Sequence, residues 1–200
     1  MLKIVDYYFA PNSPWTYLGH QRFVDLIMGH QAAMNLKPVD FGKVFAVSGG
    51  LPLAKRAPQR QAYRLMELKR WRDVLDVPLN IQPKFFPVNP DLAALVIIAA
   101  GENKSGVGPS LAYDLMRAVW AEERDIADVQ TVAGIIKAKG LPEDELLAAA
   151  QSPETRAAYE ALTKEAMDRG VFGAPTYAFR DELFWGQDRL DFLDRALAAS

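Results

Sequence analysis

Cysteine is absent from this chain of 200 residues. Disulfide bonds, thiolate metal ligands and a protein thiol as redox group are therefore excluded, and any thiol chemistry needs a thiol from another molecule. Histidine is scarce, since His20 and His30 are the only two. Neither has a second histidine or an acidic residue at metal-ligand spacing. We therefore expect no metal site, and we expect both histidines at the surface or at helix ends.

A strong excess of one charge is also missing. The net charge is −2 and the pI is about 5.7, whereas nucleic-acid-binding surfaces are usually strongly basic, so we expect no nucleic-acid partner. Cations do gather in one segment that Glu67 and Asp73 interrupt: Lys55, Arg56, Arg60, Arg64, Lys69, Arg70 and Arg72. A solvated helix face is the first interpretation of this segment, and a local anion site is the second.

Long hydrophobic runs are missing too. The most apolar window, 92–100, is far shorter than the ~20 residues that cross a bilayer. The N-terminus does not have the pattern of a signal peptide, because Asp6 and Pro11 come too early. We expect no membrane partner and a cytoplasmic location. Half of the residues are hydrophobic, which suffices for one large domain or for a domain with a sizeable insertion.

The N-terminal segment predicts a strand, a sharp turn and a helix. Residues 2–9 are rich in β-branched and aromatic residues, as in a strand. Asn12 or Ser13 is a good helix N-cap, and Pro14 fits the first helical turn. Ser13 would then lie where backbone N–H groups converge. The partial positive charge of such a helix N-terminus stabilises a nearby anion by ~0.3–1 kcal/mol.

Periodicity and turn residues predict the other elements. They are a second strand over 36–41, a long loop over 47–58, a helix over 61–75, further helices up to Gly170, strands over 176–179 and 183–185, and a final helix. Pro175 opens the first of the late strands, where a cis peptide bond would be a deliberate feature. The order predicts a β-α-β opening, a helical middle and a late pair of strands.

Four segments resemble those of a known family. They are Ser13 to Gly19 (SPWTYLG), Phe85 to Pro90 (FFPVNP), Gly170 to Thr176 (GVFGAPT) and Gly186 to Leu190 (GQDRL). In this order they resemble the 2-hydroxychromene-2-carboxylate isomerases and their relatives, the kappa-class glutathione transferases, within the thioredoxin superfamily. The resemblance implies an α/β fold with a thioredoxin-like sheet and a large all-helical insertion, as in DsbA and the kappa class. Residues 1–45 and 170–200 would form the thioredoxin-like domain, and 46–169 the insertion.

The resemblance also implies glutathione as the cofactor. The Ser13 hydroxyl would donate a hydrogen bond to the glutathione thiolate and hold it ionised. The backbone of Ala174, before a cis Pro175, would bind the peptide-like part of glutathione. Further contacts are implied from Arg60 to the glycine carboxylate, and from Gln187 and Asp188 to the γ-glutamyl end. The alternative is that Ser13, Gln187 and Asp188 only cap helices.

Three residues are expected at the substrate: Trp15, Gly50 and Phe86. The two aromatic rings would form an apolar wall for an aromatic or enone substrate. The sequence departs from the family pattern at Ala10, where relatives commonly carry Asp, at Gly50, where they carry Asn, and at Arg60, where they carry Lys. Arg60 can still bind a carboxylate through two hydrogen bonds.

The implied function is a glutathione-dependent isomerase that interconverts 2-hydroxychromene-2-carboxylate and trans-o-hydroxybenzylidenepyruvate, or a close analogue, by reversible thiol addition. One alternative is a kappa-class-like glutathione transferase, which would release the adduct. Another is a redox-inactive binding module with the thioredoxin fold. The sequence leaves the oligomeric state open, with a homodimer as one candidate.

Overall fold

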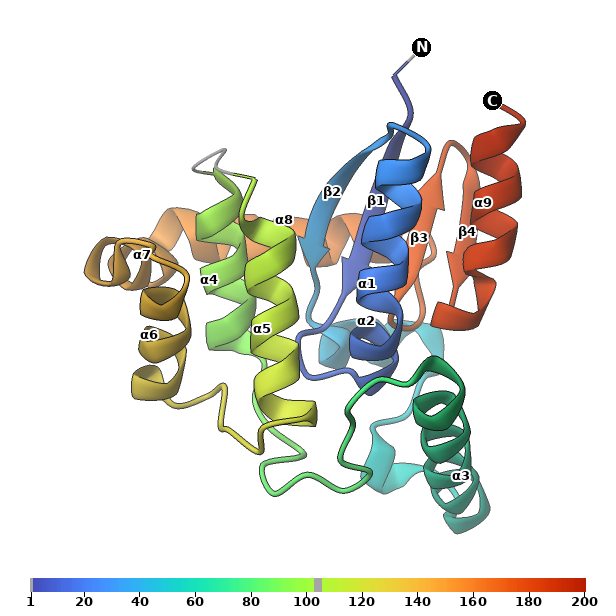
Figure 1. Cartoon of the computed structure of the whole chain (residues 1–200), viewed down its shortest axis with the longest axis horizontal. Coiled ribbons are helices and arrows are strands. Elements are labelled where there is room, and N and C mark those ends of the chain that lie inside the picture. Colours follow the sequence, from blue (N-terminus) through green and yellow to red (C-terminus); the bar gives the residue numbers. More distant parts are fainter. Residues whose placement is uncertain (1, 103–105) are drawn as a thin grey trace.

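The computed structural model describes residues 2–102 and 106–200, and in these residues four strands form one mixed sheet (Figure 1). The strands, in the spatial order β2-β1-β3-β4, are β1 (Ile4–Phe9), β2 (Ala33–Pro38), β3 (Thr176–Phe179) and β4 (Glu182–Trp185). β1 runs parallel to β2 and antiparallel to β3, and β4 is antiparallel to β3. The predicted β-α-β opening and late strand pair are therefore confirmed.

Helices make up most of the remaining described residues. They are α1 (Pro14–Gly29), α2 (Phe41–Ser48), α3 (Pro58–Leu75), α4 (Asp91–Glu102), α5 (Gly108–Trp120), α6 (Val129–Ala138), α7 (Glu143–Ala150), α8 (Pro153–Asp168) and α9 (Leu190–Ala198), with short 3-10 turns η1 (Leu53–Lys55) and η2 (Gln187–Arg189). In Figure 1, α1 and α9 lie in front of the sheet and α8 passes behind it, whereas α4 to α7 stand beside β2. Both termini lie at the same end of the sheet, opposite the end near α3.

The two faces of β1 belong to different apolar clusters. Val5, Tyr7 and Phe9 pack into the larger cluster, which includes α1, α9 and the helices α4 to α7. Tyr8 points the other way, into a smaller cluster between the sheet and helices α2 and α8. Side chains of a strand alternate between its faces, and here all four are fully buried. β1 is therefore the central strand around which both layers are built.

The predicted second strand and the loop after it need correction. The strand is β2, which leaves the sheet after Pro38 because its partner β1 ends at Phe9. The Asp40 carboxylate then accepts hydrogen bonds from the N–H groups of Gly42 and Lys43 and caps α2, so that residue 41 is helical. The expected loop over 47–58 is in fact the end of α2, the turn η1 and the start of α3. Helix α7 was not predicted.

Within the described residues, the regular elements of the segment between β2 and β3 are all helices. Helices α4 and α8 contact β2, and α5 contacts α1, so this segment packs against the strands and helices of the sheet layer. The proposed boundaries of the insertion, 46–169, stay a prediction, as do the flanking parts 1–45 and 170–200. In the described ranges, no helix combines the length and the hydropathy needed to cross a membrane.

Candidate functional site

Two connecting segments leave the sheet at the same end. β1 and β3 are antiparallel, and Tyr8, next to the last residue of β1, lies opposite Thr176, the first residue of β3. The turn that follows β1 and the loop that precedes β3 therefore lie side by side. The first carries Ser13 and the second carries Pro175, so the strand register brings these two predicted site residues to one edge of the sheet.

Ser13 is the N-cap of α1. Its Oγ accepts a hydrogen bond from the Thr16 N–H at 3.3 Å, and its own N–H donates to the Ala10 carbonyl at 3.0 Å. Among the described residues, the Ser13 hydroxyl hydrogen has no protein acceptor, and the side chain is only partly buried. The hydroxyl can therefore donate to a ligand at the positive end of the α1 dipole.

The peptide bond between Ala174 and Pro175 is cis, as predicted. The loop is held by two hydrogen bonds, one from the Thr176 hydroxyl to the Gly173 carbonyl at 2.6 Å and one from the Gly186 N–H to the Pro175 carbonyl at 2.9 Å. Ala174 itself has no hydrogen bond from its N–H or its C=O within the described part of the chain. This half-buried residue therefore offers a donor and an acceptor to a peptide-like ligand.

The side chain of Gln187 is hydrogen-bonded to α1, whereas that of Asp188 pairs with the neighbouring Arg189. Gln187 is 2% exposed, and its Oε1 accepts a hydrogen bond from Arg22 Nη1 at 2.9 Å. It packs so closely on Gly19 that a Cβ at that glycine would lie 2.6 Å from the Gln187 Cβ. The Asp188 carboxylate pairs with Arg189 at 2.8 Å and keeps 40% of its side chain exposed. Asp188 is thus open to a ligand cation, whereas the amide oxygen of Gln187 is already used.

Gly50 lies in the connection between α2 and α3, and Arg60 lies just after it, in α3. A Cβ at Gly50 would overlap the Phe45 ring, so any side chain at this position requires that ring to move. Gly50 can therefore offer only backbone groups while Phe45 keeps its position. Arg60 is exposed in the first turn of α3 and, among the described residues, forms no salt bridge. It is free to bind an anion.

Phe86 contributes to a cluster that the sequence did not reveal. Its ring centre lies 4.8 Å from that of Trp120, and the Arg64 guanidinium lies 5.2 Å from the Phe86 ring centre. Phe86 also precedes a cis proline. Two residues later, the Val88 carbonyl accepts a hydrogen bond from Asn12 Nδ2 at 2.8 Å, which joins this segment to the Ser13 turn. The sequence signal for Arg64 is the basic segment from Lys55 to Arg72, if that segment is interpreted as a local anion site.

Trp15, the other predicted wall residue, is half-buried in the second position of α1. It packs against the larger apolar cluster. Its ring is thus partly fixed by the core and partly exposed at the N-terminal end of α1. That placement is compatible with an apolar contact to a substrate near Ser13.

The prediction that His20 lies at the surface or at a helix end is wrong. His20 is 1% exposed in the middle of α1. Its Nε2 donates to the Pro109 carbonyl at 2.9 Å, since a carbonyl can only accept, and its Nδ1 then accepts from the Tyr7 hydroxyl at 3.3 Å. Burial lowers the His20 pKa to about 4. His30, in contrast, is the C-cap residue of α1 and lies at a helix end as predicted.

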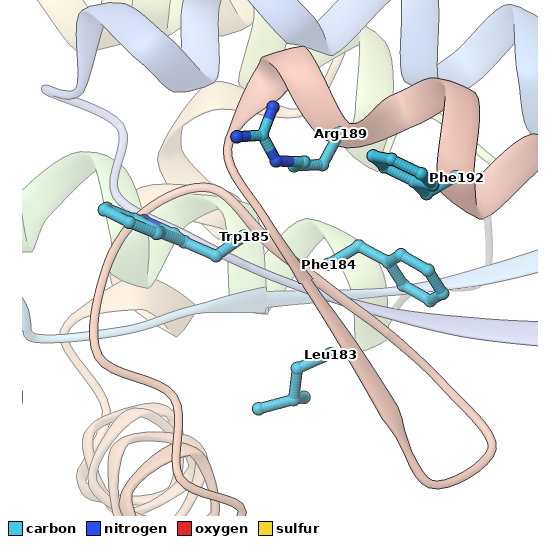
Figure 2. Close-up of a pocket in the computed structure, with 5 residues that line it drawn as sticks. All are labelled: Leu183, Phe184, Trp185, Arg189 and Phe192. Atoms are coloured by element: carbon cyan, nitrogen blue, oxygen red, sulfur yellow. The ribbon is translucent and has the colours of Figure 1, made fainter.

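One hollow, which Ser13 does not line, lies at the β4 edge of the sheet. Figure 2 shows this hollow of about 370 Å³ on β4 and the start of α9, lined by Leu183, Phe184, Trp185, Arg189 and Phe192. The indole of Trp185 also packs on Gly173, where a Cβ would overlap its Nε1, so one residue that lines this hollow contacts the cis-proline loop. Within the described residues, no group of three or more His, Asp or Glu side chains could hold a metal ion.

The comparisons with known proteins concern the fold and the family. Residues 4–198 match the DSBA-like thioredoxin domain. The chain belongs to the DsbA-like thioredoxin family. Within this family it is 30% identical over 198 residues to the 2-hydroxychromene-2-carboxylate isomerase of Sphingobium xenophagum, a match that covers 98% of this chain and 99% of that protein.

Two further relatives of this DsbA-like chain also match it over nearly its full length. The solved structure of a 2-hydroxychromene-2-carboxylate isomerase superposes with a TM-score of 0.83 at 26% identity, covering 98% of this chain and 95% of the other. Glutathione S-transferase kappa 2 of Caenorhabditis elegans is 25% identical over 211 residues, covering 96% of this chain and 92% of that protein. The predicted thioredoxin-like fold with helical additions and the predicted family are confirmed.

Proposed function

We propose that this DsbA-like protein is a glutathione-dependent isomerase that interconverts 2-hydroxychromene-2-carboxylate and trans-o-hydroxybenzylidenepyruvate, or a close analogue. The observation that carries the proposal is that the turn with Ser13 and the cis Ala174–Pro175 loop lie at the same edge of the sheet in a chain without cysteine. A thioredoxin-like site without its own cysteines can bind an external thiol without thiol–disulfide exchange between the protein and that thiol. The full-length relatives named as isomerases support the reaction type.

The residues of the site fit glutathione. Ser13 has a hydroxyl hydrogen to donate to a sulfur anion, and the N-terminus of α1 stabilises that anion. Ala174 has an unused N–H and C=O for the cysteinyl backbone of glutathione. The exposed Asp188 carboxylate would bind its α-ammonium group, and Arg60 its glycine carboxylate. Gln187 would act through its backbone or by positioning Asp188, because Arg22 holds its amide oxygen.

Glutathione held by these residues would supply a thiolate for reversible addition to the unsaturated carbon of the enone, with no net redox change or hydrolysis. Ser13 would lower the pKa of the glutathione thiol, because its hydroxyl forms a stronger hydrogen bond with the thiolate than with the neutral thiol. Trp15 and Phe86 would hold the aromatic part of the substrate, and the backbone at Gly50 would border it.

A second candidate function is glutathione conjugation, which the kappa-class relative favours. The two functions differ in what happens to the thiol. An isomerase expels glutathione and uses it catalytically, whereas a transferase consumes one thiol for each product. A redox-inactive binding module, the third reading of the fold, would bind glutathione without any turnover.

The test is turnover with limiting glutathione. Enzyme is mixed with about a tenfold excess of a hydroxychromene carboxylate over glutathione, and both the chromophore and the free thiol are followed. We expect full conversion with the thiol retained. Conversion that stops when the thiol is exhausted would contradict an isomerase and support a transferase. Glutathione binding without conversion of any enone would support the binding module.

A further inference from the structure

Arg64 lies among aromatic rings and, among the residues that the structure describes, has no counter-ion. Its guanidinium lies 5.2 Å from the ring centre of Phe86 and 5.8 Å from that of Trp120. Its Nη2 is buried and has no hydrogen-bond partner among the described residues. Burial, as the main cause, and repulsion by Arg56, as the second, lower the pKa of Arg64 to about 10. The group is therefore still charged at neutral pH. A buried charge of this kind is costly unless something pairs with it.

A second unpaired donor lies beside it. Trp120 is fully buried, and its Nε1–H has no partner in the described part of the chain. Most buried polar groups in native proteins are hydrogen-bonded, so two neighbouring orphans call for an explanation. Both groups can only donate. The partner that would satisfy them is therefore an acceptor, and the charge of Arg64 favours a negative one.

The surrounding charges point the same way. Arg56, Arg60 and Arg64 follow one another at intervals of four residues, and none of them forms a salt bridge within the described residues. The pKa of Arg56 is lowered by burial and then by repulsion from Arg60, as expected for cations that lie near one another. An anion bound there would relieve the repulsion as well as the two orphan donors.

The cluster is close to the Ser13 turn through the chain itself. Phe86 belongs to the segment that Asn12 holds by its hydrogen bond to the Val88 carbonyl. Helix α3, which carries Arg64, contacts α1. In Figure 1, α3 lies beyond the end of the sheet at which α1 begins. A molecule that reacts near Ser13 and rests on Phe86 would therefore bring a substituent to Arg64.

We propose that Arg64, with the Nε1–H of Trp120, binds the carboxylate of the substrate and so selects aromatic or enone carboxylates over uncharged analogues. The identity of the substrate rests on the proposed function, whereas the carboxylate subsite is inferred from the two unpaired donors and the neighbouring arginines. Glutathione also has carboxylates, and it is the other source of the same chemistry. The inference is that the substrate, not glutathione, occupies Arg64.

The test measures binding and does not need turnover. Isothermal titration compares 2-naphthoate with the uncharged 2-naphthamide on the wild-type protein and on Arg64→Gln, Arg64→Lys and Arg70→Gln. Arg70 lies on the same helix but is exposed and paired with Glu67, so its variant is the matched control. Glutathione is titrated into each protein separately, and thermal unfolding checks that each variant is folded.

We expect Arg64→Gln to weaken naphthoate binding by about 10- to 100-fold, the usual scale for a charge-assisted pair, with naphthamide and glutathione changed less than about twofold. Arg64→Lys should keep part of the preference for naphthoate, and Arg70→Gln all of it. Equal affinity of the wild type for the two probes, or equal naphthoate binding by wild type and Arg64→Gln, would overturn the proposal. If Arg64→Gln weakened glutathione binding and left naphthoate binding unchanged, Arg64 would be assigned to glutathione, and the proposal would be overturned as well. Failure of the isomerase assay would leave these binding results standing.

Discussion

Ser13 has a structural counterpart elsewhere in the chain. Ser152 also precedes a proline, caps a helix and accepts a hydrogen bond from the N–H of a threonine three residues on, at 3.1 Å against 3.3 Å for Ser13. The local roles of the two serines are therefore the same. Only Ser13 lies at the edge of the sheet where the cis Ala174–Pro175 loop begins. Variants of the two serines therefore test whether Ser13 does more than cap a helix.

Alanine variants of the two serines should share one effect and differ in another. Each should lower the free energy of unfolding by ~1 kcal/mol, the cost of a lost N-cap. Ser13→Ala should also lower kcat/KM for isomerisation by ~10–100-fold, on the scale of ~1.4–2.7 kcal/mol for one hydrogen bond to an anion. Urea denaturation and steady-state kinetics measure the two effects. Unchanged turnover in Ser13→Ala would mean that the serine is only a cap.

At the scale of elements, the approach of α1 to η2 positions Asp188. Gly19 makes that approach close, because an added Cβ would lie 2.6 Å from the Cβ of Gln187 and 3.1 Å from the Tyr177 hydroxyl. Gly29, at the end of the same helix, has nothing within 4 Å of an added Cβ. The two glycines thus differ in packing while they share one helix.

We expect Gly19→Ala to destabilise the protein and Gly29→Ala to leave it unchanged or slightly more stable. Overpacking costs ~1–3 kcal/mol, which exceeds the ~0.5–1 kcal/mol that alanine contributes to a helix. Because η2 must shift, Gly19→Ala should also weaken glutathione binding. Thermal unfolding and calorimetric titration give both quantities. Equal stabilisation by the two substitutions would show that α1 and η2 are not in the close contact described.

Much of the element order could be predicted from the sequence because its signals are local. Ser13 and Ser152 are caps followed by prolines, and helices begin after both as expected. Helix α2 was missed because Phe41 continues an apolar alternation, although Asp40 is a good N-cap. Helix α7 was missed although its first turn holds Glu143, Asp144 and Glu145, which favour a helix N-terminus.

The candidate site was predictable only where a motif marked it. Ser13 and the cis Pro175 belong to family segments, and the cis bond was expected from them. For Arg64 the only local signal is the basic segment, because the aromatic rings that surround it, Phe86 and Trp120, are distant in sequence. His20 was misjudged for the same reason, since its burial is produced by tertiary packing against Tyr7 and Pro109.

At the scale of the whole molecule, His20 links the sheet layer to the helical segment. It lies on α1, accepts from Tyr7 of β1 and donates to the Pro109 carbonyl at the start of α5. Burial lowers its pKa from 6.5 to about 4. The unfolded chain therefore binds a proton at a pH at which folded His20 stays neutral, and folding must compete with that protonation.

Stability should consequently fall as the pH drops from about 6.5 towards about 4, by ~3 kcal/mol from this residue. Above pH 6.5 the contribution is fully present. His20→Gln should flatten this part of the profile, whereas His30→Gln should keep it. Urea denaturation at pH 7 and at pH 4.5 is the measurement. Parallel profiles for wild type and His20→Gln would contradict a buried neutral His20.

The central claim is that the Ser13 turn and the Ala174–Pro175 loop hold glutathione as a thiolate. The most direct measurement is the pKa of the bound thiol, followed by the ultraviolet absorbance of the thiolate as the pH of the saturated complex is varied. A free thiol has a pKa of about 8.5. We predict a value at least about one unit lower in the complex, and a rise back towards 8.5 in the Ser13→Ala complex. Glutathione that does not bind, or that binds with the pKa of a free thiol, would contradict the account.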